Sequence, residues 1–255
     1  MTIMKYRMMI AVCGAILLLG MLGIWLGPEP AYEAPNGELV GGEMTAIEEP
    51  IDTIVCNWAS GDIRISESPD AYVHHRTLSP KGSAGHHAYS CSWYEGEMTI
   101  DDDLDEGFTD KLIGEKKNNV LELQLPQDQI TSFVLEQQVG DVTIDGVNIS
   151  SLDVAMGPGD LTLSGNIDTA ALVMEDGDLY FTTETVPASL SVSGKAGDAW
   201  IDLPANDGFT LRHDLGDGAL TSNFYLIDQD DTTAIHGNGA AQISVTLADG
   251  SLEIR

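Results

Sequence analysis

After residue 50 the chain alternates hydrophobic and polar residues in short runs. Leu152, Val154 and Met156 occupy every second position of one run, and Leu161 and Leu163 do so in the next. A period of two over about five residues is typical of a β-strand with one buried face. No apolar stretch in this region keeps the 3.6-residue spacing of an amphipathic helix. The pattern therefore predicts an all-β fold.

Gly-Asp pairs separate these runs at a nearly constant distance. Five of them follow one another at intervals of 19, 18, 20 and 19 residues: Gly140-Asp141, Gly159-Asp160, Gly177-Asp178, Gly197-Asp198 and Gly216-Asp217. A sixth pair, Gly61-Asp62, precedes Gly140 by 79 residues, which is close to four periods. Such a unit of two strands and two turns cannot bury its own inner face, but stacked units can, at about 4.8 Å per rung.

The repeat predicts a β-solenoid of rungs of about 19 residues, flattened so that two parallel sheets enclose an aliphatic core. Residues 51–128 are irregular and residues 129–255 hold the regular repeats. An antiparallel β-sandwich is the alternative, because it also has regular turns. The repetition of sequence as well as spacing favours the solenoid. We expect the first rung, at 53–66, and the last, ending at Arg255, to cap the stack, because open edges invite aggregation.

The first 50 residues differ from the rest of the chain. Residues 8–27 carry no charge and are long enough, as a helix, to cross the roughly 30 Å hydrocarbon core of a bilayer. Lys5 and Arg7 precede this run, which predicts a cytoplasmic N-terminus at residues 1–7 and an extracellular C-terminal domain at 51–255. Residues 28–50, rich in Pro, Gly and Glu, read as an acidic linker. A cleaved signal peptide is the alternative, but the exit of the run lacks an Ala-x-Ala site.

The net charge of the chain limits the classes of molecule that it can bind. The chain has 41 acidic and 11 basic residues, for a formal net charge of −30. Nucleic-acid binding through a basic face is excluded, because phosphate neutralisation needs Lys and Arg. Disorder is disfavoured by a composition that is 43% hydrophobic and only 20% charged. The charge instead predicts a surface that repels anionic lipids and polymers.

Residues 118–255 resemble a bacterial family of membrane-anchored β-strand-repeat proteins known as putative adhesins. The resemblance lies in the strand NNVLELQLP and in the turns VGDVTIDG, PGDLTLSG, DGDLYFTT, AGDAWIDLP and LGDGALTSNF. Residues 51–117 fit more loosely, through SGDIRIS, and depart from the family in a loop at 79–85 and two Cys-x-Trp triplets. The resemblance implies a surface-exposed, solenoid-like domain with a role in adhesion. Some members sit beside envelope-stress regulators, which implies a second kind of role.

The regular Gly-Asp spacing predicts a column of aspartates along one edge of the stack: Asp141, Asp160, Asp178, Asp198 and Asp217. Neighbouring carboxylates about 5 Å apart repel by about 1 kcal/mol in water. We expect glycine to supply a positive φ and aspartate to accept hydrogen bonds from its own turn. A Ca²⁺-binding ladder is the alternative, but the nine-residue spacing of calcium rolls is missing.

Cys56 and Cys91 are the cysteines outside the predicted anchor. Because cysteine pairs outside the cytoplasm tend to oxidise, we predict a disulfide between them. Two buried thiols in strands are the alternative.

Two histidine pairs, His74-His75 and His86-His87, flank a turn signal at 79–82. A hairpin centred there places His75 opposite His86 and His74 opposite His87. With Asp70 or Cys91 such a pair offers a Zn²⁺ site, but the lack of a third ligand favours exposed polar strand residues.

Signatures of catalysis are missing from the sequence: there is no Gly-x-Ser-x-Gly elbow, no His-Glu-x-x-His and no phosphate loop. The sequence therefore predicts a non-catalytic cell-surface binding or adhesion module, without a cofactor, that contacts an unidentified surface ligand or envelope protein. An accessory or sensor component of a cell-envelope stress response is the alternative, and a carbohydrate-active enzyme comes third.

Overall fold

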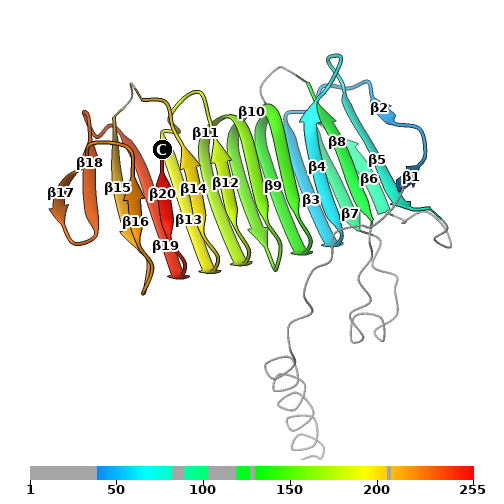
Figure 1. The fold of residues 1–255 in the computed structure, drawn as a ribbon. Coiled ribbons are helices and arrows are strands. Elements are labelled where there is room, and N and C mark those ends of the chain that lie inside the picture. The colour runs from blue at the N-terminus through cyan, green and yellow to red at the C-terminus, as the bar shows by residue number, and fades with distance from the viewer. Residues whose placement is uncertain (1–38, 82–88, 103–118, 127–129, 206–207) are drawn as a thin grey trace, which may run out of the picture. The chain divides into compact units, whose positions relative to one another are not determined.

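The computed structural model describes residues 39–81, 89–102, 119–126, 130–205 and 208–255 (Figure 1). The described residues all belong to one compact unit, Tyr32–Arg255. The predicted cytoplasmic N-terminus, anchor and first part of the linker lie outside the described residues. Within the described ranges every regular element is a β-strand, and none is a helix of the length and hydropathy needed to span a bilayer.

The strands form one hydrogen-bonded network that is folded into two layers. In spatial order, the first layer holds β6 (Tyr89–Tyr94), β7 (Glu97–Asp102), β3 (Thr53–Ser60), β9 (Ile130–Val139), the second halves of β10 (Val142–Met156) and β11 (Leu161–Asp176), β13 (Ser189–Ala196), β19 (Ala241–Asp249), β15 (Phe209–Asp214), β18 (Thr233–His236) and β17 (Ile227–Asp230).

The second layer has the matching order. It holds β1 (Leu39–Gly41) and β2 (Thr45–Ile47) beside β5 (Val73–Pro80), then β8 (Val120–Leu125), β4 (Asp62–Glu67), the first halves of β10 and β11, β12 (Leu179–Thr182), β14 (Ala199–Asp202), β20 (Leu252–Ile254) and β16 (Leu220–Ser222).

Neighbouring rungs pair in parallel, which confirms the solenoid and excludes the antiparallel sandwich. In the middle of the stack Leu152 lies beside Ala170, and Leu172 lies beside Val192 in the next rung. Inward side chains at alternate positions are almost completely buried between the layers, so the period of two in the sequence forms the aliphatic core. Phe133, Phe181 and Phe209 are the largest residues of this part of the core.

The order of rungs in space differs from their order in the chain at both ends. The rung β3–β4 lies between β7–β8 and β9–β10, although β7–β8 follows it in sequence. The last rung, β19–β20, lies between β13–β14 and β15–β16, and Figure 1 shows its red strands between yellow and orange ones. The prediction that the first and last rungs cap the stack is therefore wrong. Both are interior rungs with a parallel neighbour on each side.

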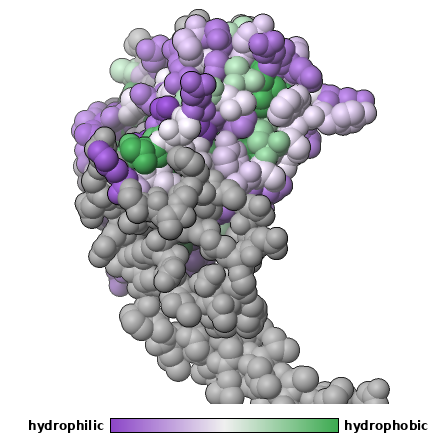
Figure 2. Space-filling view, turned by 90° about the vertical axis from the view of Figure 1, so that its right-hand side faces the viewer, coloured by the Kyte–Doolittle hydropathy of each residue, from purple (hydrophilic) through white to green (hydrophobic). Residues whose placement is uncertain are grey.

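Antiparallel strands cover most of the stack's ends instead. At one end β6 pairs with β7, and β5 pairs with β8 while carrying β1 and β2 on its outer edge. At the other end the β17–β18 hairpin continues the first layer beyond β15. The surface of the first of these ends is largely hydrophilic, with a few scattered hydrophobic residues (Figure 2). These additions come from segments between repeats, which a 19-residue spacing does not predict.

Candidate functional site

The Gly-Asp turns form a hydrogen-bonded ladder where the chain passes from the first layer to the second. In each step the backbone N–H of one residue donates to Oδ1 of the aspartate in the neighbouring rung: Asp141 to Asp62 (3.2 Å), Asp160 to Asp141 (2.9 Å), Asp178 to Asp160 (2.9 Å), Asp198 to Asp178 (2.9 Å) and Ser251 to Asp198 (2.7 Å). The aspartates therefore accept hydrogen bonds from backbone N–H groups, but the expectation that each donor lies in the same turn is wrong, because it lies in the next rung.

The ladder differs from the predicted column at two aspartates, Asp217 and Asp62. Asp217 is not part of it, because the turn between β15 and β16 is longer and Ala219 takes the equivalent place, donating from its N–H to Oγ of Ser251 (3.3 Å). Asp62 begins the ladder, although the 79 residues that separate it from Asp141 hid this adjacency in the sequence. The glycines stack as well: an added Cβ at Gly159 would lie 2.0 Å from the carbonyl oxygen of Gly140.

Burial and mutual repulsion shift the acidity of the first two ladder members. Burial is the main cause that raises the pKa of Asp62 to about 6, and the neighbouring Asp141 carboxylate adds to it. Burial, followed by repulsion from Asp160, also raises the pKa of Asp141. Across the described ranges, no three His, Cys, Asp or Glu side chains gather as they would around a metal ion. The Ca²⁺ ladder thus stays a prediction, and the observed partners of the carboxylates are backbone N–H groups.

The predicted disulfide is not formed. Cys56 on β3 and Cys91 on β6 are free thiols, and both lie opposite Ile100 of the intervening strand β7. Two strand spacings, about 9.6 Å, exceed the Cα separation of up to about 7 Å that a disulfide can bridge. Burial raises the pKa of both thiols. The alternative of two thiols in strands is therefore the one that fits, with Cys56 buried and Cys91 half-buried.

The histidines do not form the predicted hairpin. The antiparallel partner of β5 is β8, so His75 lies opposite Leu123, whereas β6 belongs to the other layer. His86 and His87 lie outside the described residues. His74 contacts the Asp70 carboxylate (Nε2–Oδ1, 2.8 Å), which lowers the pKa of Asp70. His75 is buried rather than exposed, its Nδ1 is 2.6 Å from the Tyr89 hydroxyl, and burial lowers its pKa.

A pair of stacked aromatic rings stands on the outer face of the second layer. Tyr180 of β12 and Trp200 of β14 are in register on adjacent parallel strands, with ring centroids 4.7 Å apart and planes within 5°. Tyr180 is 40% exposed. This pair was not predicted from the sequence. The pattern that indicates it is an aromatic residue two positions after the Asp in two consecutive turns, DLYF and DAWI.

Hydroxyls and carboxylates surround this pair. Along the same outer row Thr143 and Thr162 precede Tyr180, and Glu253 follows Trp200, each in register on the next strand. The Tyr180 hydroxyl is 3.4 Å from Oδ2 of Asp178 in the ladder. Desolvation, followed by the ladder carboxylates, raises the pKa of Tyr180. The row therefore combines apolar ring surface with hydrogen-bonding groups that repeat at the strand spacing.

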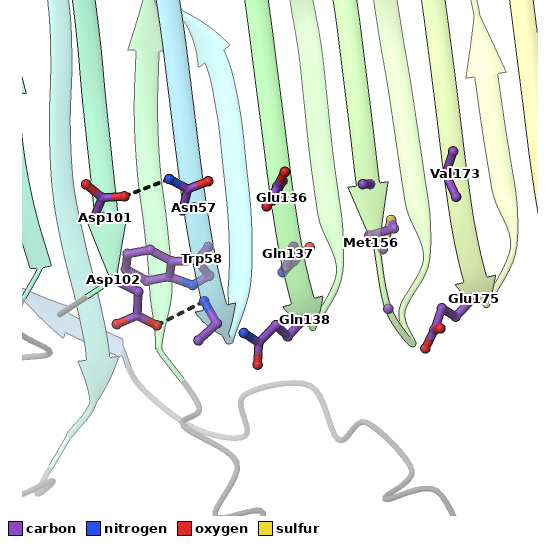
Figure 3. Close-up of a pocket in the computed structure, with 13 residues that line it drawn as sticks. Asn57, Trp58, Asp101, Asp102, Glu136, Gln137, Gln138, Met156, Val173 and Glu175 are labelled. Atoms are coloured by element: carbon purple, nitrogen blue, oxygen red, sulfur yellow. Dashed lines mark hydrogen bonds between the residues drawn. The ribbon is translucent and has the colours of Figure 1, made fainter. Parts of the chain in front are cut away.

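A groove of about 710 Å³ lies along the first layer, at the ends of β7, β3, β9, β10 and β11 (Figure 3). Its acidic lining residues are Asp101, Asp102, Glu136 and Glu175. Asn57 donates from Nδ2 to Oδ1 of Asp101 (2.7 Å), and the Ala59 N–H donates to Oδ2 of Asp102 (3.0 Å), so two of the carboxylates have partners within the groove. Asp101 and Asp102 both belong to β7.

The comparisons with solved structures concern the fold. A putative cell adhesion protein from Clostridium sporogenes is 18% identical, with a TM-score of 0.54, and the match covers 85% of this chain and 99% of that one. Putative adhesins from Bacteroides fragilis (13% identity, 88% and 100% coverage, TM-score 0.46) and Parabacteroides distasonis (12% identity, 87% and 99% coverage, TM-score 0.34) are more distant. No curated protein matches the chain.

The sequence itself identifies the family. The family model described as Toastrack DUF4097 matches residues 51–255, the whole of the repeat region and its irregular N-terminal part. Its match and the stacked parallel rungs agree with the resemblance found in the Gly-Asp turns. The chain therefore belongs to the Toastrack DUF4097 family.

Proposed function

We propose that this protein is a non-catalytic cell-surface binding module that recognises neutral carbohydrate on the outer face of its second layer. The stacked pair of exposed Tyr180 and half-buried Trp200 carries the proposal. Sugar rings present C–H groups that pack against aromatic surfaces, and an aromatic ring that also carries a polar group suits a contact that is partly apolar and partly wet. Both rings lie on the outer face of the second layer, outside the core between the layers.

The neighbouring side chains suit the hydroxyl groups of a sugar. Thr143 and Thr162 offer hydroxyls that donate and accept, and Glu253 offers a carboxylate that accepts. Because these groups occupy one row across parallel strands, they recur at about 4.8 Å along the stack. An extended polymer lying along the row would meet similar groups at successive rungs.

Charge selects among polymers. The aspartate ladder runs beside the aromatic pair, and the whole chain has a net charge of −30. Such a surface repels polyanions, so a neutral glycan fits it better than a phosphate- or carboxylate-bearing one. The anchor predicted at residues 8–27 would hold the domain at the outer side of the membrane, where such polymers occur. The name of the Clostridium relative, a putative cell adhesion protein, supports a binding role.

The test is titration calorimetry on the full chain with cellohexaose and chitohexaose as neutral probes and polygalacturonate as the anionic one. We expect a neutral probe to bind, and Trp200→Ala and Tyr180→Ala each to weaken binding at least about tenfold, or about 1.4 kcal/mol. Trp93→Ala, at a tryptophan that is 41% exposed on β6, is the matched control and should leave affinity unchanged. Equal affinity of the parent and Trp200→Ala, or binding of polygalacturonate alone, would refute the proposal.

A further inference from the structure

The last rung of the chain fills a slot between two rungs that precede it. β19 pairs in parallel with β13 on one side and β15 on the other, and β20 pairs with β14 and β16 in the same way. Among the described strands, no pairing joins β13 to β15 or β14 to β16. The two rungs on either side are therefore held together through residues 241–255.

The slot makes extensive contacts with the rung β19–β20. The rung buries Ile243, Val245, Leu247, Leu252 and Ile254, each no more than 4% exposed, between the two layers. The backbone of both walls takes part: the Gln242 N–H donates to the Ala188 carbonyl (3.0 Å), and the Leu252 N–H donates to the Ala219 carbonyl (2.9 Å). Without the rung, both layers would present open strand edges beside an uncovered apolar core, which is the situation that drives strand addition.

The slot also selects the sequence that enters it. A Cβ at Gly250 would lie 1.9 Å from the carbonyl oxygen of Gly197, and a Cβ at Gly218 would lie 1.8 Å from the Gly250 carbonyl oxygen, so the corner admits only glycine. The next residue, Ser251, must donate its N–H to the Asp198 carboxylate (2.7 Å). Asp249-Gly250-Ser251 in the chain's own last rung meets these conditions. The occupant that matches the slot at every position is therefore this segment, whichever copy of the chain provides it.

The link to this rung is short and tightly held. Residues 237–240 lead from β18, on one side of β15, to β19 on the other. Gly237 and Gly239 have φ values of +59° and +66°, and the Thr210 hydroxyl donates to the Gly239 carbonyl (2.9 Å). Short links between an element and its docking site favour exchange of that element between copies, because a short link must turn sharply to close within one copy and the docked contacts are the same in either copy.

We propose that the partner of this slot is a second copy of the chain, and that residues 241–255 of one copy fill the slot of another. The exchange is reciprocal in a closed pair, because each copy gives one rung and receives one. It connects copies through the interior of the stack, and it does not depend on carbohydrate binding by the Tyr180–Trp200 face.

The test uses cysteine pairs that span native neighbours, in full-length chains whose three native cysteines are replaced by alanine. Ser191 and Ser244 are exposed Cα partners on β13 and β19, so a disulfide between an S191C chain and an S244C chain reports exchange. The matched control is D153C with A171C, a pair with the same register on β10 and β11 in the middle of the stack. The chains are mixed, unfolded, refolded together and mildly oxidised.

We expect a mixed S191C–S244C dimer whose ratio to monomer rises in proportion to protein concentration during refolding, and no mixed D153C–A171C dimer. Gly239→Ala should increase the mixed dimer, because the added Cβ lies 3.0 Å from the Thr210 hydroxyl and strains the closed link. Two glycines inserted after Asn238 should decrease it. A chain carrying both S191C and S244C that cross-links internally, with no mixed dimer at any concentration, would overturn the proposal. Equal mixed dimer from both cysteine pairs would overturn it too, since it would indicate general misassembly.

Discussion

The glycine column gives the sharpest test of the rung stack. At Gly159 φ is +148°, and an added Cβ would lie 2.0 Å from the carbonyl oxygen and 2.5 Å from the carbonyl carbon of Gly140. Gly146, at the other corner of the stack, also has a positive φ of +69°, but it has no atom within 4 Å of the added Cβ. Gly159→Ala and Gly146→Ala both place alanine at a positive φ, and only Gly159→Ala adds a steric clash.

The magnitude follows from these two contributions. A positive φ costs a non-glycine residue about 1–2 kcal/mol, which is the expected loss for Gly146→Ala. At Gly159 the rungs must move apart by about 1.4 Å to restore an ordinary contact, and overpacking of this kind adds about 1–3 kcal/mol. The hydrogen bonds from the Gly159 N–H to the Asp176 carbonyl (2.8 Å) and from the Gly140 N–H to the Pro158 carbonyl (3.0 Å) resist that movement. We expect Gly159→Ala to lose about 2–5 kcal/mol in total.

Urea denaturation followed by far-UV circular dichroism measures both losses, with an unchanged m-value showing that the comparison is valid. The third variant, Gly42→Ala, has neither a positive φ nor a nearby atom and should match the parent within about 0.5 kcal/mol. If Gly159→Ala and Gly146→Ala lose the same stability, contact between stacked glycines does not limit this corner, and the reasoning is wrong.

Three further predictions concern the ladder and the core. Asp160→Ala removes the acceptor for the Asp178 N–H, so urea denaturation should show a loss of about 1 kcal/mol in the free energy of unfolding. Asp160→Asn keeps an acceptor and removes a repelling charge, so this variant should be at least as stable as the parent at low salt. Asp62→Asn should stabilise the protein above pH 6 and not near pH 3.5. The pKa of Asp62 is about 6 in the folded protein against 3.8 unfolded, so stability is lost as pH rises between these values; the linkage is at most about 3 kcal/mol, which already includes the attraction of Arg64. His75→Gln should reduce the fall in melting temperature at acid pH. The pKa of His75 is lowered in the folded protein, so the parent loses stability as pH falls below about 6.5. The same dependence of melting temperature on pH in parent and variant would contradict this.

The sequence was sufficient for the interior of the fold because its signals there are local. Alternation along Leu152, Val154 and Met156 defines the inner face of one strand, and the Gly-Asp turn after it fixes where the chain crosses to the other layer. Both signals act within one rung and its neighbour, so a single sequence contains them completely. The aromatic pair was missed for the opposite reason: Tyr180 and Trp200 are 20 residues apart, and their stacking becomes evident only when the turns are aligned position by position.

The histidine prediction failed where adjacency in sequence was taken for adjacency in space. His75 lies on β5, and β6 follows it in the chain but enters the other layer. The disulfide prediction rested on the redox compartment alone, which does not report that β7 separates Cys56 from Cys91 within one layer. A turn signal such as the one at 79–82 predicts a change of direction, and it cannot tell whether the next strand pairs with the last or crosses to the opposite layer. In a two-layer stack both outcomes bury the same apolar face, so composition does not discriminate between them.

The order of the rungs in space is difficult to predict from the sequence, because the repeated rungs resemble one another. Rungs β15–β16 and β19–β20 each present a corner glycine and an apolar inner face, so both are chemically suited to follow β13–β14. Two differences decide between them. β19–β20 carries glycine at 250 next to the donor Ser251, which fits directly against Gly197 and Asp198, whereas the turn of β15–β16 is displaced and places Asp217 outside the ladder. A corner that accepts the better-fitting rung, whatever the position of that rung in the chain, explains why residues 241–255 lie between two earlier rungs. By the same logic, that corner cannot distinguish residues 241–255 of its own chain from those of another copy.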